Sequence, residues 1–303
     1  MVEGLLRMTV GLMPHRQLVG CSQFFSFADS KIGEILHFHR QTGEELVRIW
    51  KLLRYESRVF SEYDQFQDFV RRSGNYIYLS DSGIIAILER WRPHLSCLVI
   101  WELVPAAASR APVIKDLIES VREEGFQQLA SSLLTEEGKE PYLEAGFQEF
   151  ENIIKMEKKG LDCPRVREPA LLLPAEEGHL ELLVELEREA FPPFWRLDEE
   201  SFRQFLKGDH FLVALLKGRM VGYNISNILG KQGMIYRLGV LPSFQSQGIG
   251  SQLLTGALRW FADQGVGSVV LTTQEGNREG RRLYEKFGFK ALRGKLHILR
   301  YDY

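Results

Sequence analysis

Leu238-Gly-Val-Leu-Pro-Ser-Phe-Gln-Ser-Gln-Gly-Ile-Gly-Ser-Gln-Leu-Leu254 joins an apolar strand to an amphipathic helix through a loop with two glycines, Gly248 and Gly250. Glycine allows the backbone to approach a ligand without interference from a Cβ atom, and the N-terminus of a helix favours negative charge. The helix carries apolar residues at helical spacing, so one of its faces is predicted to pack against a sheet. These residues are Leu253, Leu254, Ala257, Leu258 and Phe261. The stretch therefore predicts one unit made of a strand, an anion-binding loop and a helix.

The spacing of the glycines restricts the kind of anion site. A glycine-rich turn alone also fits a plain tight connection. The Gly-x-Gly-x-x-Gly pattern of dinucleotide sites is absent, because Leu253 occupies the third position, and no Lys-Ser/Thr follows as in a Walker A loop. Gln245-Ser-Gln-Gly-Ile-Gly250 instead resembles the Gln/Arg-x-x-Gly-x-Gly/Ala loop with which GCN5-related N-acetyltransferases (the GNAT family) hold the pyrophosphate of acetyl-coenzyme A.

A second segment, residues 269–289, resembles the same family. It reads as a strand, a short loop, a helix, a glycine C-cap and a strand. In the family, an Asn after the fifth strand contacts the pantetheine arm, and a helix Tyr lies near the thioester sulfur. The matching residues are Asn277 and Tyr284. Taken with the loop, this match makes residues 167–303 similar to a whole GNAT domain.

The resemblance implies a site for acetyl-coenzyme A as co-substrate, with no metal. The fourth strand of the family diverges from its neighbour, and the Val240 N–H is expected to stabilise the oxyanion there. Tyr284 is expected to protonate the departing thiolate, with simple packing of the ring as the alternative reading. Arg281 is expected to reach the phosphate or the pantetheine. The remaining cofactor residues are expected to be Leu238, Gly239, Gln245, Ser246, Gln247, Gly248, Ile249, Gly250 and Ser251.

The general base is not evident. Ribosomal-protein acetylases of the family have a Glu five residues before the position of Asn277, where this chain has Thr272. Glu275 is close in sequence but fits a solvated cap, and Tyr236 and Arg237 offer no base. The Phe191–Trp195 segment fits a packed helix break, and in the family it often borders the acceptor site. An acidic run fits a solvated helix face: Glu176, Glu177, Glu181, Glu185, Glu187 and Glu189.

The chain contains a repeat. Glu140-Pro-Tyr-Leu-Glu-Ala-Gly-Phe147 aligns with Arg282-Leu-Tyr-Glu-Lys-Phe-Gly-Phe289, so Tyr142 corresponds to Tyr284, and Gly125 corresponds to Gly265. The first copy has Ala108-Ser-Arg-Ala-Pro-Val113 in place of the glycine loop, and Pro112 removes a backbone donor. The side chains of Ala111 and Val113 are expected to stand where the phosphates approach. Only the second copy is therefore predicted to bind coenzyme A.

We predict an α/β (α+β) protein with two tandem GNAT-like domains, each a mixed, mostly antiparallel sheet flanked by helices. The predicted ranges are an extension at 1–30, a degenerate domain at 31–160, a linker at 161–168 and a coenzyme-binding domain at 169–303. Expected strands lie at 35–38, 76–79, 84–90, 95–103, 170–173, 211–216, 219–228 and 233–241. Expected helices lie at 44–54, 63–71 and 177–190, with a further helix capped by Asp198.

Composition describes an ordinary globular protein: 303 residues, 45% hydrophobic, 26% charged, with a net charge of −2. This charge gives no case for nucleic acid or membrane partners. Cys21, Cys97 and Cys163 are odd in number and far apart, which argues against disulfides and for a reducing cytoplasm. His37 and His39 alternate as on one strand face, but no third metal ligand has suitable spacing.

The expected activity is acetyl-coenzyme A-dependent transfer of an acetyl group to a primary amine of a small molecule or a peptide. A homodimer is possible on this reading. Two alternatives stay open. The first is a non-catalytic coenzyme A sensor or scaffold, which the missing carboxylate favours and the presence of Asn277 and Tyr284 disfavours. The second is a nucleotide-binding interaction domain, which rests on the glycines alone.

Overall fold

The structure is a computed structural model of the 303-residue chain. The residues that it describes are 35–37, 43–54, 57, 60, 62–71, 75–80, 84–92, 95–104 and 110–303. The predicted extension at 1–30, together with Cys21 and His39, lies outside this part of the chain. Within it, no helix is long and apolar enough to cross a membrane, and no three His, Cys, Asp or Glu side chains are grouped as for a metal ion.

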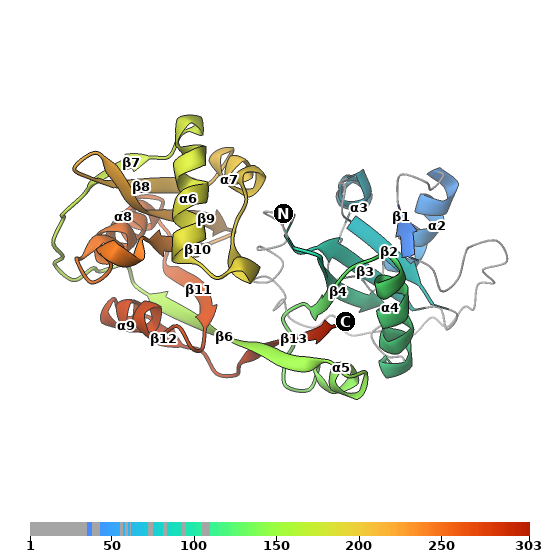
Figure 1. Ribbon diagram of the computed structural model, residues 1–303. Coiled ribbons are helices and arrows are strands. Elements are labelled where there is room, and N and C mark those ends of the chain that lie inside the picture. Colours follow the sequence, from blue (N-terminus) through green and yellow to red (C-terminus); the bar gives the residue numbers. More distant parts are fainter. Residues whose placement is uncertain are drawn as a thin grey trace. The chain divides into compact units, whose positions relative to one another are not determined.

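The chain divides into two compact units, whose elements are labelled in Figure 1. Of the described residues, the C-terminal unit holds Asn152–Lys295, and the N-terminal unit holds those up to Glu151 together with Leu296–Tyr303. This division differs from the predicted ranges 31–160, 161–168 and 169–303. Residues 152–160 belong to the C-terminal unit, and the last eight residues of the predicted C-terminal domain belong to the N-terminal unit.

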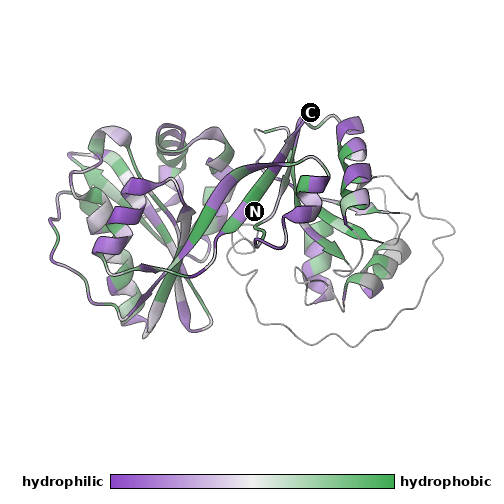
Figure 2. Cartoon of the chain, turned by 90° about the horizontal axis from the view of Figure 1, so that it is seen from below, coloured by the Kyte–Doolittle hydropathy of each residue, from purple (hydrophilic) through white to green (hydrophobic). Residues whose placement is uncertain are grey.

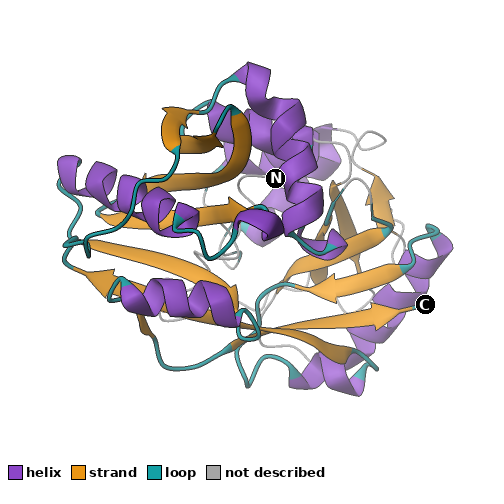
Figure 3. Ribbon diagram, turned by 60° about the vertical axis from the view of Figure 1, so that its left-hand side comes forward, coloured by secondary structure: helices purple, strands orange, loops and turns teal. Residues whose placement is uncertain are grey.

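The sheet of the C-terminal unit has the order β7-β8-β9-β10-β11-β6, and β12 pairs with β6. Its pairings are antiparallel except between β10 and β11, which are parallel. Helices lie against the strands, as Figure 3 shows. The elements are β6 (Gln148–Lys159), β7 (Leu171–Pro174), α6 (Leu180–Ala190), α7 (Glu199–Leu206), β8 (His210–Leu216), β9 (Arg219–Leu229), β10 (Gln232–Val240), α8 (Ile249–Asp263), β11 (Ser268–Gln274), α9 (Arg278–Lys286) and β12 (Lys290–Ala291).

Apolar clusters attach the helices of this unit to the sheet. One cluster joins α6 and α7 to β8 and β9 through residues such as Leu183, Phe202 and Phe211. A second joins α8 and α9 to β6, β10 and β11. The predicted apolar face of α8 is confirmed, since all five of its residues are buried. Asp198 caps α7 as predicted, accepting a hydrogen bond from the Ser201 N–H at 2.9 Å.

The N-terminal unit repeats this topology in the order β1-β2-β3-β4-β5-β13, with the parallel pair between β4 and β5. The helix α4 buries Val113, Ile114 and Leu117 in the apolar cluster of this unit, and most of its exposed residues are polar. Figure 2 shows that the helices of the chain carry both hydrophilic and hydrophobic residues. The elements are β1 (Ile35–His37), α2 (Gly43–Leu53), α3 (Tyr63–Arg71), β2 (Asn75–Leu79), β3 (Ile85–Arg90), β4 (Cys97–Val104), α4 (Ala111–Glu123), β5 (Gln128–Ser131), α5 (Glu140–Glu144) and β13 (Leu296–Asp302).

The two copies exchange their last strands. The strand β6, which ends the first copy in sequence, pairs with β11 of the C-terminal unit from Lys159↔Ser268 to Ile153↔Gln274. The strand β13, which ends the second copy, pairs with β5 of the N-terminal unit and buries Ile298 and Leu299 there. The sheet of each unit is therefore completed by the last strand of the other copy.

The repeat extends to local backbone geometry. Gly125 and Gly265 both follow a helix with a positive φ, at +81° and +70°. Tyr142 of α5 is buried, 3% exposed, like its counterpart Tyr284 in α9 at 8%. Gly125 and Gly265 thus share the left-handed conformation that ends a helix, and Tyr142 and Tyr284 share their burial. Both similarities support the alignment made from sequence.

Candidate active site

The parallel pairing of β10 with β11 covers only the first half of β10. It runs from Gln232↔Ser268 to Ile235↔Leu271 and then stops, while β10 stays paired with β9 as far as Val240↔Gly222. The strands thus diverge as expected for the fourth strand. Because Leu241 N–H donates to Val221 on the β9 side, the alternation of a strand puts the Val240 N–H on the open side.

A β-bulge lies where the divergence begins. Ile235 pairs with Ser226 and Arg237 with Ile225, so Tyr236 is the extra residue of β10. The bulge places Tyr236 and Arg237 on the same side of the sheet. The Tyr236 ring lies 6.0 Å from that of Phe205 in α7, and the Arg237 guanidinium lies 3.6 Å from the Phe191 ring centroid. Two large polar side chains therefore border the opening between β10 and β11.

The first copy has the same bulge and the same divergence. Ile87 pairs with Glu102 and Leu88 with Ile100, which makes Trp101 the extra residue of β4. The pairing of β4 with β5 ends at Ile100↔Ser131. A diverging strand is therefore common to both units, and other features must distinguish them.

The glycine loop forms the distinguishing feature. Ser246 and Gly248 have positive φ values of 61° and 92°, and the first intrahelical bond of α8 runs from Gln252 N–H to Gly248 O. The N–H groups of the first turn, residues 249–251, consequently have no carbonyl partner within the helix. Gln245 donates from Nε2 to the Val240 carbonyl at 3.1 Å, which ties the loop to β10. The loop is a cradle of unpaired backbone donors at a helix N-terminus.

Not every loop residue faces a ligand. The Ile249 side chain is 1% exposed in the core, so only its backbone belongs to the cradle. A Cβ on Gly250 would lie 3.3 Å from Leu283 of α9, so this glycine also permits close helix packing. A Cβ on Gly248 would meet no atom nearer than 3.8 Å. Glycine is needed at this position because the backbone is left-handed, and not because space is short.

The corresponding helix start in the first copy lacks the cradle. Arg110 caps α4 with a right-handed φ of −93°, and Pro112 in the first turn has no N–H. The expected obstruction by Ala111 and Val113 is wrong, because both side chains are buried, Val113 against β4 and β5. The difference at the described positions is the missing N–H of Pro112 and the right-handed conformation of Arg110, since the helix turns the side chains of Ala111 and Val113 inward.

Tyr284 is buried at the edge of the diverging strands. Its ring belongs to the cluster that contains Leu238 and Leu254, and no described residue forms a hydrogen bond with its hydroxyl. Burial raises the pKa of Tyr284 to about 12, and the positive charge of Arg237 opposes this rise. At neutral pH the phenol is protonated, in the state that an acid requires.

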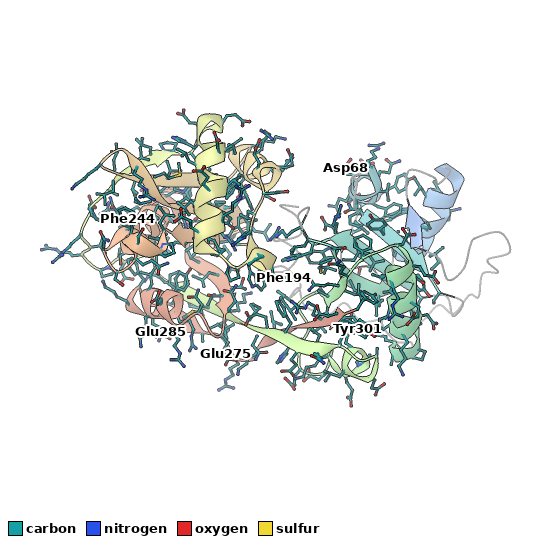
Figure 4. The ribbon with its side chains drawn as sticks, in the orientation of Figure 1. Asp68, Phe194, Phe244, Glu275, Glu285 and Tyr301 are labelled. Carbon is teal, nitrogen blue, oxygen red and sulfur yellow. The ribbon has the colours of Figure 1, made fainter. Side chains whose placement is uncertain are left out.

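Asn277 and Arg281 are engaged within the protein. The Asn277 side chain caps α9, accepting from the Gly280 N–H at 3.0 Å, and its amide nitrogen donates to Thr273 Oγ1 at 3.0 Å. Arg281 donates to the Glu275 carbonyl at 3.1 Å and lies 4.0 Å from the Glu285 carboxylate. Both acidic residues are labelled in Figure 4.

Glu275 is poorly suited to act as a base. Its carboxylate lies 2.5 Å from Lys295 Nζ, and this hydrogen bond is the main cause that lowers the pKa of Glu275. Asn152 of β6 donates a further hydrogen bond at 3.3 Å. Glu275 is therefore an ion-paired residue and more than a solvated cap. Thr272 lies in β11, and its hydroxyl cannot act as a general base at neutral pH.

Glu187 departs from the predicted solvated face of its helix. Its side chain is fully buried, and its carboxylate accepts hydrogen bonds from Tyr223, from Arg237 and from the Leu197 N–H at 2.9 Å. The assignment of Glu187 to a wet face is wrong. The sequence gives no sign that this glutamate is buried, because its partners come from the loop after α6 and from β9 and β10, which are distant in the chain.

These features define an α/β domain with an anion cradle beside two diverging strands. Residues 180–289 match the model of the acetyltransferase (GNAT) family. This part of the C-terminal unit is therefore similar to the GNAT family, as the resemblance implied.

Solved structures share the fold of the larger part of the chain. A GCN5-related N-acetyltransferase from Sphaerobacter thermophilus is 16% identical over 86% of this chain and 94% of that one, with a TM-score of 0.59. A tandem GNAT protein from the clavulanic acid biosynthesis pathway is 12% identical over 89% and 97%, with a TM-score of 0.62. A probable N-acyltransferase from Enterococcus faecalis V583 is 11% identical over 86% and 71%, with a TM-score of 0.63. No curated protein matches the chain.

Proposed function

We propose that this protein transfers an acetyl group from acetyl-coenzyme A to a primary amine, with the C-terminal unit as the only coenzyme site. The observation that carries the proposal is the cradle of residues 245–251 beside the divergence that begins after Ile235↔Leu271. Both units have the divergence, and among the residues that the structure describes only those of the C-terminal unit form a cradle. The family match at residues 180–289 supports the same assignment.

The proposed chemistry uses few side chains. The loop N–H groups would bind the pyrophosphate. The backbone groups of Leu238 and Val240 on the open side of β10 would pair with the pantetheine amides, whereas those of Gly239 face Tyr223 of β9. A neutral amine then attacks the acetyl carbon, and the Val240 N–H would stabilise the oxygen as it becomes negative. When the carbon–sulfur bond breaks, Tyr284 would give its proton to the thiolate, and the amine's extra proton would pass through water to the phenolate and restore Tyr284.

The first experiment is a calorimetric titration of the full chain with acetyl-coenzyme A. Gly248→Val should abolish binding, because a β-branched residue does not adopt the left-handed conformation of this position. Gly218→Val is the matched control, since Gly218 has a similar φ of 79° in the β8–β9 turn and open space around it. Unchanged binding by Gly248→Val, or no binding by the folded wild type, would remove the proposed site.

A coenzyme A sensor without turnover is the second candidate. It is supported by the absence of a carboxylate at Thr272 and by the ion pair that Glu275 forms with Lys295. A panel of primary amines and peptides, assayed for thiol release from acetyl-coenzyme A, separates the two. Binding without turnover on the whole panel would favour the sensor.

A further inference from the structure

A buried ion pair lies between the helix break and the bulge of β10. Glu187 in α6 is fully buried and the Arg237 side chain is 10% exposed. Their contact is direct, from Arg237 Nη2 to Glu187 Oε1. Tyr223 of β9 donates to the other carboxylate oxygen, and burial together with the charge of Glu187 raises the pKa of this phenol. The charges are thus held without free access to solvent.

The pair holds the segment after α6 by its backbone. Glu187 accepts from the Leu197 N–H at 2.9 Å, and Arg237 donates to the Trp195 carbonyl at 2.7 Å. The guanidinium also lies 3.6 Å from the Phe191 ring centroid. Arg237 of β10 therefore contacts the segment at Phe191 and Trp195, and Glu187 of α6 holds its other end at Leu197.

The same residues fix the diverging strand. The Arg237 carbonyl accepts from Asn224 Nδ2 at 3.0 Å, and Leu238 follows directly in the strand. At Gly239 a Cβ would lie 2.7 Å from Tyr223 and 3.1 Å from Phe191, so the two rings pack directly on this stretch of backbone. Any shift of the ion pair would therefore move the open edge that faces the proposed thioester.

Stability alone does not explain such a pair. Moving two charges out of water costs as much as their attraction returns, and apolar replacements of buried pairs are often neutral or stabilising. One donor of Arg237, its Nε, is buried and bonds to no described residue, so the guanidinium is not fully satisfied by the fold. A positioning role accounts for both facts, because such a role requires a rigid planar cation at this place and does not require maximal stability.

We propose that Glu187 and Arg237 are a positioning pair, which holds segment 191–197 and the backbone of residues 238–240 in the geometry that the acetyl transfer needs. This inference rests on the proposed function for its catalytic consequence. It adds a residue pair that contacts the backbone beside the proposed thioester position and that the loop motif does not include.

The test uses the full-length protein with Glu187→Gln, Arg237→Met and the double variant. The glutamine keeps an acceptor oxygen for the Leu197 N–H and presents its amide nitrogen to the Tyr223 hydroxyl, which can accept. The methionine removes the donors to Glu187 and Trp195. Each single variant leaves one buried charge without a partner and should lower the melting temperature, whereas the double variant should regain stability. Glu185→Gln, at an exposed position of the same helix, is the control.

Turnover and binding should separate in the folded double variant. We expect turnover at saturating acetyl-coenzyme A to fall about tenfold or more, because small misplacements of reacting groups have large effects on rate. The dissociation constant of coenzyme A should change by less than about threefold, since the pyrophosphate cradle is elsewhere. Recovery of turnover together with stability would overturn the proposal, because a merely structural pair predicts that result.

Amide hydrogen exchange provides a readout that needs no activity. In the double variant, peptides that cover residues 191–198 should exchange about tenfold faster, while those of α8 should not change. If the wild type acetylates no amine, the proposed function fails and exchange still tests the pair. Unchanged exchange of 191–198 would overturn the positioning role regardless of activity.

Discussion

Ile235 lies opposite Leu271 in the last pair of the parallel ladder between β10 and β11. Beyond this pair the Val240 N–H faces the opening, and the glycine cradle follows within ten residues of chain. In the N-terminal unit Ile100 and Ser131 end the corresponding ladder, but Pro112 and a right-handed Arg110 follow. The two units therefore share the diverging strands and differ in the start of the following helix, where we propose that the C-terminal unit binds the coenzyme.

Tyr284→Phe tests the proposed acid. Since burial keeps the pKa of Tyr284 at about 12, the phenol holds its proton at neutral pH, and its loss should lower turnover about tenfold. Affinity for acetyl-coenzyme A should stay the same. Tyr142→Phe is the matched control, because Tyr142 is the buried counterpart of Tyr284 in the unit without a cradle. Equal turnover in all three proteins would leave Tyr284 as a packing residue.

Leu299→Ala should destabilise the N-terminal unit, although Leu299 is the fifth residue from the end of the sequence. Its side chain is fully buried in the cluster that holds Leu117 and Leu129, and large-to-small changes of this kind cost about 2–5 kcal/mol. Hydrogen exchange should accelerate in β4 and β5 and stay unchanged in β9 and β10. Leu292→Ala, at a 39% exposed position, is the control. Loosening confined to the C-terminal unit would contradict the strand exchange.

Cutting the chain between residues 160 and 161 should produce two fragments that do not fold alone. Fragment 1–160 lacks β13 as the partner of β5, and fragment 161–303 lacks β6 as the partner of β11. A missing strand exposes a row of unpaired backbone groups and removes the apolar contacts of Ile154 and Met156. Mixing the fragments should restore cooperative thermal unfolding, measured by circular dichroism. Cooperative unfolding of fragment 161–303 alone would contradict this expectation.

Asp209→Asn should change how stability depends on pH. Asp209 precedes β8, and burial raises its pKa from 3.8 to about 6, while a hydrogen bond with Asn227 opposes the rise. The folded state therefore holds this proton more tightly than the unfolded state, so Asp209 lowers stability as pH rises from about 4 to 6. The variant should have a higher melting temperature than the wild type at pH 7 and a similar one at pH 4.

Asp116→Asn, at an exposed position of α4, is the control for that measurement. An equal difference between Asp209→Asn and the wild type at pH 4 and pH 7 would show that the titration of Asp209 does not contribute.

Much of the C-terminal unit followed from local sequence. The glycine spacing, the apolar face of α8 and the Asp198 cap depend on residues close together in the chain, so their patterns are readable without a fold. The predicted domain boundary at residue 160 differs from the division of the structure, in which the C-terminal unit begins at Asn152. Glycine and prolines mark where the chain turns. They do not reveal which sheet the preceding strand joins.

The burial of Glu187 illustrates what lay outside the sequence pattern. Its helix reads as charged and exposed, yet Tyr223, Arg237 and Leu197 meet at this one carboxylate. The bulge at Tyr236 contributes, since one extra residue brings Arg237 to the same side of the sheet. A single inserted residue in a strand leaves no periodic trace strong enough to be predicted.

The sequence by itself determined the resemblance of the second copy to the GNAT family, the glycine spacing of the loop and the repeat, because each depends on short-range order that glycine, proline and apolar spacing impose. The tertiary structure alone decided that β6 and β13 exchange between the copies and that Glu187 pairs with Arg237. Strand pairing and ion pairing depend on contacts between residues far apart in the chain. Equivalent strands of two similar copies fit either sheet by pattern, so only the folded arrangement distinguishes them.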